Sequence, residues 1–142
     1  MSVLRFHMNS PMNPSEVMDV LTDFSPARAQ EWPTIDAENF TVHERGATWA
    51  DVTEGTDSSW ERARYEWDPA GNKVTATTLD SKVFGPGGGW EFRMTPEGEG
   101  TRVDIQLARE HPDTFKGKML NTILPFAAPV FRKTFKGPLK ST

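Results

Sequence analysis

The spacing of hydrophobic positions changes several times along the chain, and each change marks a different predicted element. Residues 3–9 alternate apolar and polar side chains, as a strand with one buried face does. Asn13 can cap a helix that has Pro14 at its first position, and the apolar residues that follow recur at helical spacing. A second short helix is predicted over 27–31, and it should end before Pro33.

From residue 40 onward, apolar residues recur at every second position, as they do in a strand with one buried face. The predicted strands cover 40–43, 48–53, 60–67, 74–79, 90–94 and 103–107, with turns rich in Gly, Pro, Asn and Asp between most of them. Short strands that follow each other through such turns indicate an antiparallel meander.

After Asp113, which can act as a cap, the pattern is helical again. Apolar residues form two neighbouring stripes, Phe115, Met119, Ile123, Phe126, Val130 and Leu120, Leu124, Ala127, Phe131, Phe135. Two stripes are too wide for a helix lying on a surface, so we expect this helix to be clasped by the sheet. Pro125 and Pro129 each remove a backbone donor and should bend it.

The order of these elements predicts an α+β fold of one domain, residues 1–142, with the helices on one side of an antiparallel sheet. A strongly curved sheet and one long helix cannot close face to face everywhere. The gap between them predicts an internal cavity of the kind that holds small ligands.

Composition and charge narrow the functions. The chain has no cysteine, which excludes disulfides and thiolate chemistry. No signal peptide or membrane span is visible, so a cytoplasmic protein is expected. From position 113 onward six basic residues face one acid, while the rest of the chain is acidic. This distribution argues against nucleic-acid binding and favours a basic helix docked on an acidic sheet, with binding to an anionic membrane surface as a weaker alternative.

The histidines and a glycine-rich segment could suggest a metal or phosphate site, but the residues around them do not fit either kind of site. His7, His43 and His111 are far apart and none has a partner at metal-ligand spacing, so no metal site is predicted. The glycine-rich segment 85–89 is followed by a strand instead of a helix, which argues against a phosphate-binding loop. It is interpreted as a flexible connection that could gate a cavity, and no cofactor is implied.

The strand 60–67 holds the densest mixture of aromatic and charged residues. Its face with Ala63, Tyr65 and Trp67 suits a cavity wall, and its other face suits solvent and cross-strand ion pairs. The reverse assignment would turn Arg62 and Arg64 inward, where they could hold a carboxylate or phenolate. An inward Tyr65 could orient a ligand carbonyl or act as a general acid, or it could be a core aromatic with a hydrogen-bonded tip.

Residues 14–24 followed by Trp32 and Pro33 resemble the opening helix and the following tryptophan of the START-like (SRPBCC) superfamily, which includes polyketide cyclases, aromatases, lipid-transfer domains and plant allergens. The segment 90–92 and the terminal helix match later strands and the lid of that superfamily. The resemblance implies a helix-grip fold, in which a curved antiparallel sheet of about six to seven strands wraps around a long C-terminal helix. It implies a hydrophobic ligand and transfers no catalytic residue.

The leading hypothesis is therefore binding of a hydrophobic small molecule, such as a lipid, polyketide or isoprenoid, in the cavity. The residues expected to line it are Trp32, Trp49, Tyr65, Trp67, Trp90, Phe92, Val103, Ile105, Phe115, Met119 and Ile123. One alternative is a cyclase or dehydratase that uses Tyr65, with Arg64 or His43, and it predicts polar side chains converging inside the cavity. The other is an interaction module that uses Phe131, Phe135 and the basic residues of the last helix.

Overall fold

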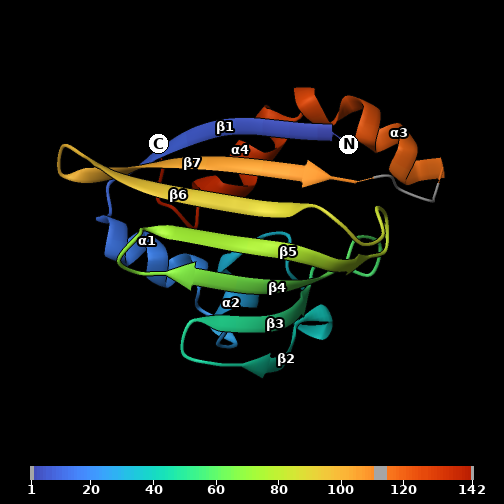
Figure 1. Ribbon diagram of the computed structural model, residues 1–142, viewed down its shortest axis with the longest axis horizontal. Coiled ribbons are helices and arrows are strands. Elements are labelled where there is room, and N and C mark those ends of the chain that lie inside the picture. Colours follow the sequence, from blue (N-terminus) through green and yellow to red (C-terminus); the bar gives the residue numbers. More distant parts are fainter. Residues whose placement is uncertain (1, 111–114, 142) are drawn as a thin grey trace.

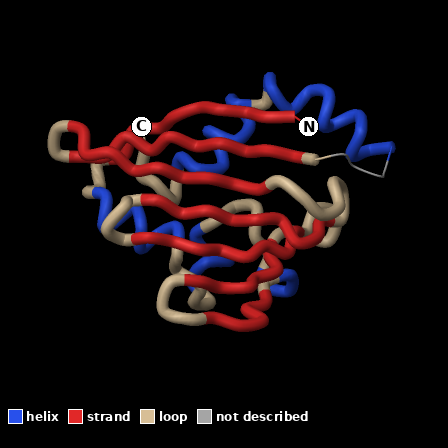
Figure 2. Tube along the Cα trace, viewed as in Figure 1, coloured by secondary structure: helices blue, strands red, loops and turns tan. Residues whose placement is uncertain are grey.

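Seven antiparallel strands form one curved sheet in the order β1-β7-β6-β5-β4-β3-β2 (Figures 1 and 2). The computed structural model describes residues 2–110 and 115–141, without the side chain of Phe115. The strands are β1 (Ser2–Ser10), β2 (Thr41–Arg45), β3 (Trp49–Glu54), β4 (Glu61–Asp68), β5 (Lys73–Ser81), β6 (Gly89–Glu97) and β7 (Gly100–Arg109). The helices lie on one side of this sheet and along its β1 edge, so the predicted α+β helix-grip class is confirmed.

One face of the sheet is apolar because the strands alternate inward and outward side chains. Val103, Ile105 and Leu107 of β7 are fully buried, and the residues between them are at most half-buried on the outer face. The same alternation places Val74 and Ala76 of β5 on the inner face. The core therefore lies between this face and the helices that cover it.

The two short helices after β1 form where the sequence predicts them. α1 (Pro14–Leu21) begins with a capping box, in which the Asn13 side chain accepts from the backbone N–H of Glu16 and the Glu16 side chain accepts from that of Asn13. α2 (Ala27–Glu31) is followed by its C-cap residue Trp32, which directly precedes Pro33. α1 packs against β5, β6 and β7, and α2 places Arg28 in the interior.

The C-terminal segment is broken where a single long helix was expected. α3 (Phe115–Ile123) is followed by the 3₁₀ turn η2 (Leu124–Phe126) and by α4 (Ala128–Lys136). Pro125 lies in the turn, and Pro129 occupies the first turn of α4, where a missing N–H costs no helical hydrogen bond. The prolines thus divide the helix in two. The predicted cap Asp113 lies outside the described residues.

Because of this break, only one of the two predicted stripes packs on the core. Leu124 and Phe135 are buried, with Ala127 and Phe131 packed beside them. The described side chains of the other stripe are exposed: Met119 53%, Ile123 54%, Phe126 83% and Val130 67%. α3 runs along the β1 edge, where the Ser2 hydroxyl donates to the Asn121 carbonyl at 2.7 Å, and it is not clasped by the sheet (Figure 1).

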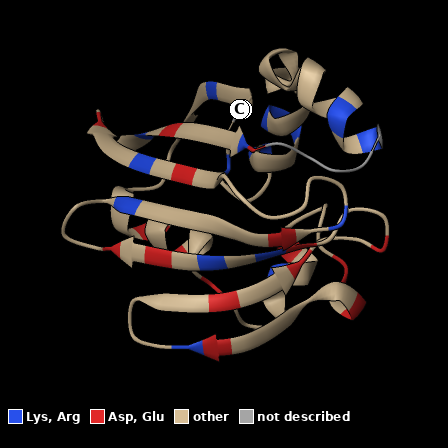
Figure 3. Cartoon of the chain, turned by 45° about the vertical axis from the view of Figure 1, so that its right-hand side comes forward, with Lys and Arg blue, Asp and Glu red and all other residues tan. Residues whose placement is uncertain are grey.

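The basic C-terminal helices do not dock on the sheet through ion pairs. Figure 3 shows lysine and arginine on α3 and α4, and both signs of charge on the strands. Among the described residues, three ion pairs join two strands, three lie within one strand, and one joins β3 to α2. α4 packs on the sheet through apolar side chains, and its Arg132 guanidinium lies 5.9 Å from the ring centroid of Phe6. In this part of the chain no helix is long and apolar enough to cross a bilayer.

Candidate functional site

A pocket of about 220 Å³ opens between the inner face of the sheet, α2 and α4. Aromatic rings form its apolar wall, namely Trp32, Trp90, Phe92, Phe131 and Phe135. Phe135 is central in this wall, because its ring meets those of Trp32, Trp90 and Phe92 edge-on at centroid distances of 5.3, 5.6 and 5.7 Å. Edge-to-face packing of this kind fixes the rings in place and gives the wall a defined shape.

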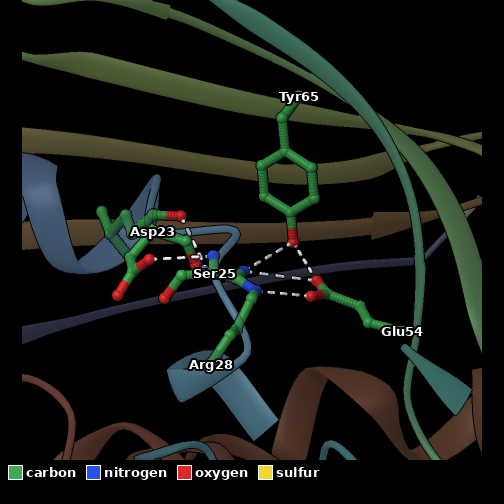
Figure 4. A network of polar contacts seen from close by, with 6 residues as sticks. Asp23, Ser25, Arg28, Glu54 and Tyr65 are labelled. Carbon is green, nitrogen blue, oxygen red and sulfur yellow. Dashed lines mark hydrogen bonds and ion pairs between the residues drawn. The ribbon is translucent and has the colours of Figure 1, made fainter. Parts of the chain in front are cut away.

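One side of the pocket is polar and centres on a buried arginine (Figure 4). Arg28 Nε lies 2.6 Å from Glu54 Oε2, and its Nη2 donates to Glu54 Oε1 at 3.4 Å and to the Tyr65 hydroxyl at 3.3 Å. Its Nη1 donates to the carbonyls of Leu21 and Asp23 at 3.1 and 3.2 Å. The Tyr65 hydroxyl donates in turn to Glu54. The ion pair, the phenol and the end of α1 are therefore joined in one network.

The network holds Tyr65 in its protonated form. Burial, followed by the negative charge of Glu54, raises the pKa of the Tyr65 hydroxyl well above 10. Burial opposes the charge of Arg28, but the nearby carboxylate of Glu54 outweighs this and raises the arginine pKa. The single proton of Tyr65 is engaged with Glu54. Tyr65 is thus inward with a hydrogen-bonded tip, and its proton is not directed at a ligand.

A second buried ion pair borders the same pocket. Arg109 Nη1 donates to Glu61 Oε1 at 2.6 Å and to the Thr78 hydroxyl at 3.0 Å, and its Nη2 donates to Glu61 Oε2 at 3.4 Å. The Thr78 hydroxyl donates to Glu61 as well. The ring of Phe84 covers the guanidinium, with its centroid 4.9 Å from Cζ. Arg109 and Glu61 both line the pocket.

The two ion pairs are neighbours because Glu54 and Glu61 are cross-strand partners of β3 and β4. Directly opposite residues of an antiparallel pair have Cβ atoms about 5 Å apart. Sequence reasoning did not identify Arg28, Glu54, Glu61 or Arg109. A signal for three of them was present, because each continues the two-residue spacing of the inward apolar residues on its strand.

Only part of the sequence-predicted lining comes together at the pocket. Trp32, Tyr65, Trp90 and Phe92 line it. Val103, Ile105 and Trp67 pack in or against the core beside it, and Trp67 lies next to Phe24 with ring centroids 6.0 Å apart. The side chain of Phe115 lies outside the described part of the structure.

The other predicted lining residues point away from the pocket. Trp49 lies on the outer face, where the Arg64 guanidinium stacks 4.4 Å from its ring centroid, because the register gives the inner position to Ala50. Met119 and Ile123 lie on the exposed side of α3, because the break after Ile123 turns that side away from the sheet.

The charged face of β4 points outward, so the reverse assignment is wrong. Arg62 pairs with Asp51 through contacts of 2.9 and 2.7 Å on the outer face. His43 Nε2 meets the Thr53 hydroxyl there at 2.7 Å, so neither His43 nor Arg64 reaches the pocket.

The glycine-rich segment 85–89 does not line the pocket either. Gly88 and Gly89 have positive φ angles and approach neighbouring backbone too closely for a Cβ. Among the described residues, no three His, Asp or Glu side chains converge as a metal site requires.

A curved antiparallel sheet with this helix order, and a pocket beneath α4, define a START-like helix-grip fold. Solved structures match the whole arrangement. A protein of Thermus thermophilus is 18% identical with a TM-score of 0.73, over 97% of this chain and 92% of its own. The Zhui aromatase/cyclase of Streptomyces sp. R1128 is 14% identical with a TM-score of 0.75, over 96% and 90%.

A START superfamily protein of Mycobacterium smegmatis is 14% identical with a TM-score of 0.72, over 99% of this chain and 98% of its own. These similarities show the fold. No protein-family model and no curated protein matches the sequence.

Proposed function

We propose that the chain binds a hydrophobic small molecule, of lipid, polyketide or isoprenoid type, in the pocket between the sheet and α4. The observation that supports this proposal is an aromatic wall facing two neighbouring ion pairs, since ligand sites combine apolar walls with a few placed polar groups. The fold supports it as well, because its structural neighbours include an aromatase/cyclase and a START superfamily protein.

The size of the pocket restricts the ligand further. Sites for drug-sized molecules have volumes of about 300–1,000 Å³, and an apolar cavity of about 150 Å³ holds one benzene ring. At about 220 Å³ the pocket accommodates one or two rings or a short branched chain. A large polycyclic polyketide or a long acyl chain would have to extend through the mouth.

A cyclase or dehydratase activity is the second candidate, because polar side chains do converge at the pocket as that alternative requires. The residues for it differ from those expected from sequence. Tyr65 has its proton engaged with Glu54, whereas the carboxylates of Glu54 and Glu61 lie at the pocket surface and could accept a proton.

Native mass spectrometry of the purified protein, with organic extraction of bound material, tests the binding proposal. Thr134→Trp on α4 should fill the pocket and displace the molecule, because Thr134 lines it. Thr122→Trp on α3 is the matched control, since Thr122 is exposed and makes the same hydroxyl contact to the carbonyl four residues earlier. Equal occupancy in both variants, or a wild-type protein that binds no member of a lipid and polyketide panel, would contradict the proposal.

A further inference from the structure

We propose that the pocket selects ligands that donate hydrogen bonds, such as phenols and neighbouring diols, and discriminates against ligands that carry a carboxylate. The inference rests on the proposed function and specifies the chemistry of its ligand. Its basis is an inventory of the donors and acceptors that the two ion pairs leave available toward the pocket.

Arg28 has no hydrogen bond left to give. A guanidinium has five N–H donors. Those of Arg28 are used by Glu54, which takes two, and by the Tyr65 hydroxyl and the carbonyls of Leu21 and Asp23. A buried arginine would ordinarily attract an anionic ligand, but here every donor is satisfied within the protein.

Arg109 is shielded only in part. Three of its five N–H donors go to Glu61 and Thr78, and one N–H of Nη2 has no partner among the described residues. Its Nε has no partner among the described residues, but that atom is completely enclosed by protein, and the same is true of Trp32 Nε1. A ligand in the pocket therefore reaches neither of these two donors without displacing protein atoms.

In both ion pairs the carboxylate is more exposed than the guanidinium. The side chain of Glu54 is 15% exposed against 4% for Arg28, and that of Glu61 is 18% exposed against 7% for Arg109. All four residues line the pocket, and the carboxylates are the more exposed charged groups among them. A ligand carboxylate placed there would meet like charge.

Among the described residues, each carboxylate also keeps one lone-pair site without a donor, and a ligand donor could occupy it. An ionised carboxylate has about four lone-pair sites. Glu54 accepts from Tyr65 and twice from Arg28, and Glu61 accepts from Thr78 and twice from Arg109. In both residues the described contacts leave Oε2 with one hydrogen bond.

The two vacant sites lie on cross-strand partners, with Cβ atoms about 5 Å apart. A ligand with two adjacent hydroxyl groups can therefore bond to both carboxylates while its rings contact the aromatic wall. Serine and threonine hydroxyls at the pocket can serve as donor or acceptor and do not alter this preference.

Calorimetric titration with four molecules of one shape tests the inference: 2,3-dihydroxynaphthalene, 2-naphthol, 2-methoxynaphthalene and 2-naphthoate. The wild-type protein should bind the diol and the naphthol about tenfold to a hundredfold more tightly than the ether and the naphthoate, the range that a hydrogen bond to a charged group gives. Naphthoate binding as tightly as naphthol would overturn the inference and leave the proposed function standing. Binding of none of the four would count against the proposed function itself.

Glu61→Gln provides an independent reading, because it leaves Arg109 without its carboxylate partner. The ratio of naphthol to naphthoate affinity should fall by at least tenfold. Asp51→Asn is the control, since it removes a carboxylate from an arginine pair on the outer face of β3 and should leave the ratio unchanged. An equal change in both variants would overturn the inference, and the wild-type series decides the question if Glu61→Gln does not fold.

Discussion

Raising the pH should destabilise the protein through Tyr65, and the chain is well suited to show it because Tyr65 is the only tyrosine. Burial and the charge of Glu54 raise the pKa of its hydroxyl well above 10 in the folded state. In the unfolded chain the hydroxyl titrates at about 10. Between these two values the folded state holds a proton that the unfolded state has lost.

The sign of the effect follows from this difference. The stabilisation linked to the protonated hydroxyl is complete below about pH 10 and is lost as pH rises toward the folded-state pKa. The free energy of unfolding should fall by up to about 1.4 kcal/mol per pH unit in that window. With an unfolding entropy of about 2.1 cal/mol/K per residue, this corresponds to a fall in Tm of about 5 °C per pH unit.

Tyr65→Phe isolates this contribution from the other groups that titrate in alkali. At neutral pH the variant should be less stable by about 1.5–3 kcal/mol, the range for a hydrogen bond to a charged group. Above about pH 10 the difference from wild type should shrink, because the variant has no hydroxyl to ionise.

Urea unfolding followed by tryptophan fluorescence gives the two stabilities, and the tyrosinate absorbance of the folded protein gives the pKa directly. A folded-state pKa near 10, together with a constant difference between the two proteins, would refute the reasoning.

Further predictions concern stability in thermal or urea unfolding. Arg28→Met should cost about 3–5 kcal/mol, because Glu54 would remain without its buried partner, and a cost below about 1 kcal/mol would contradict this. Phe135→Ala should cost about 3–5 kcal/mol because the ring is buried at the centre of the aromatic wall. Phe126→Lys should change stability by less than about 0.5 kcal/mol because its side chain is exposed, and a loss like that of Phe135→Ala would show that the stripe packs. Asn13→Ala should cost about 1 kcal/mol through loss of the capping box, and an unchanged Tm would argue against that cap.

The fold could be predicted from sequence because its signals are local and agree with one another. Period-two alternation identified the six strands from residue 40 onward, and the capping residue and prolines fixed the short helices. The C-terminal segment was harder to predict. Its two stripes are indistinguishable by periodicity, and only the break at η2 determines that Leu124 packs while Met119 is exposed.

The aromatic residues of the site could be predicted from sequence, but the charged residues at the ends of its strands could not. Trp32, Tyr65, Trp90 and Phe92 are aromatic residues at inward positions, and hydrophobic patterning finds such residues. The predicted strand 48–53 ends one residue before Glu54, although Glu54 continues the inward series of Ala50 and Val52. Charged residues can occupy inward positions when a partner from another element neutralises them, and that pairing is not visible within one strand.

The most direct test of the account is a ¹H–¹⁵N correlation spectrum of the five tryptophan indoles during titration with 2-naphthol. Trp32 and Trp90 line the pocket, whereas Trp49 lies on the outer face of β3. If the pocket binds the ligand, the indole signals of Trp32 and Trp90 should shift in parallel and saturate, while that of Trp49 should stay in place. A shift confined to Trp49, or no shift of Trp32 and Trp90 at saturating ligand, would contradict the central claim.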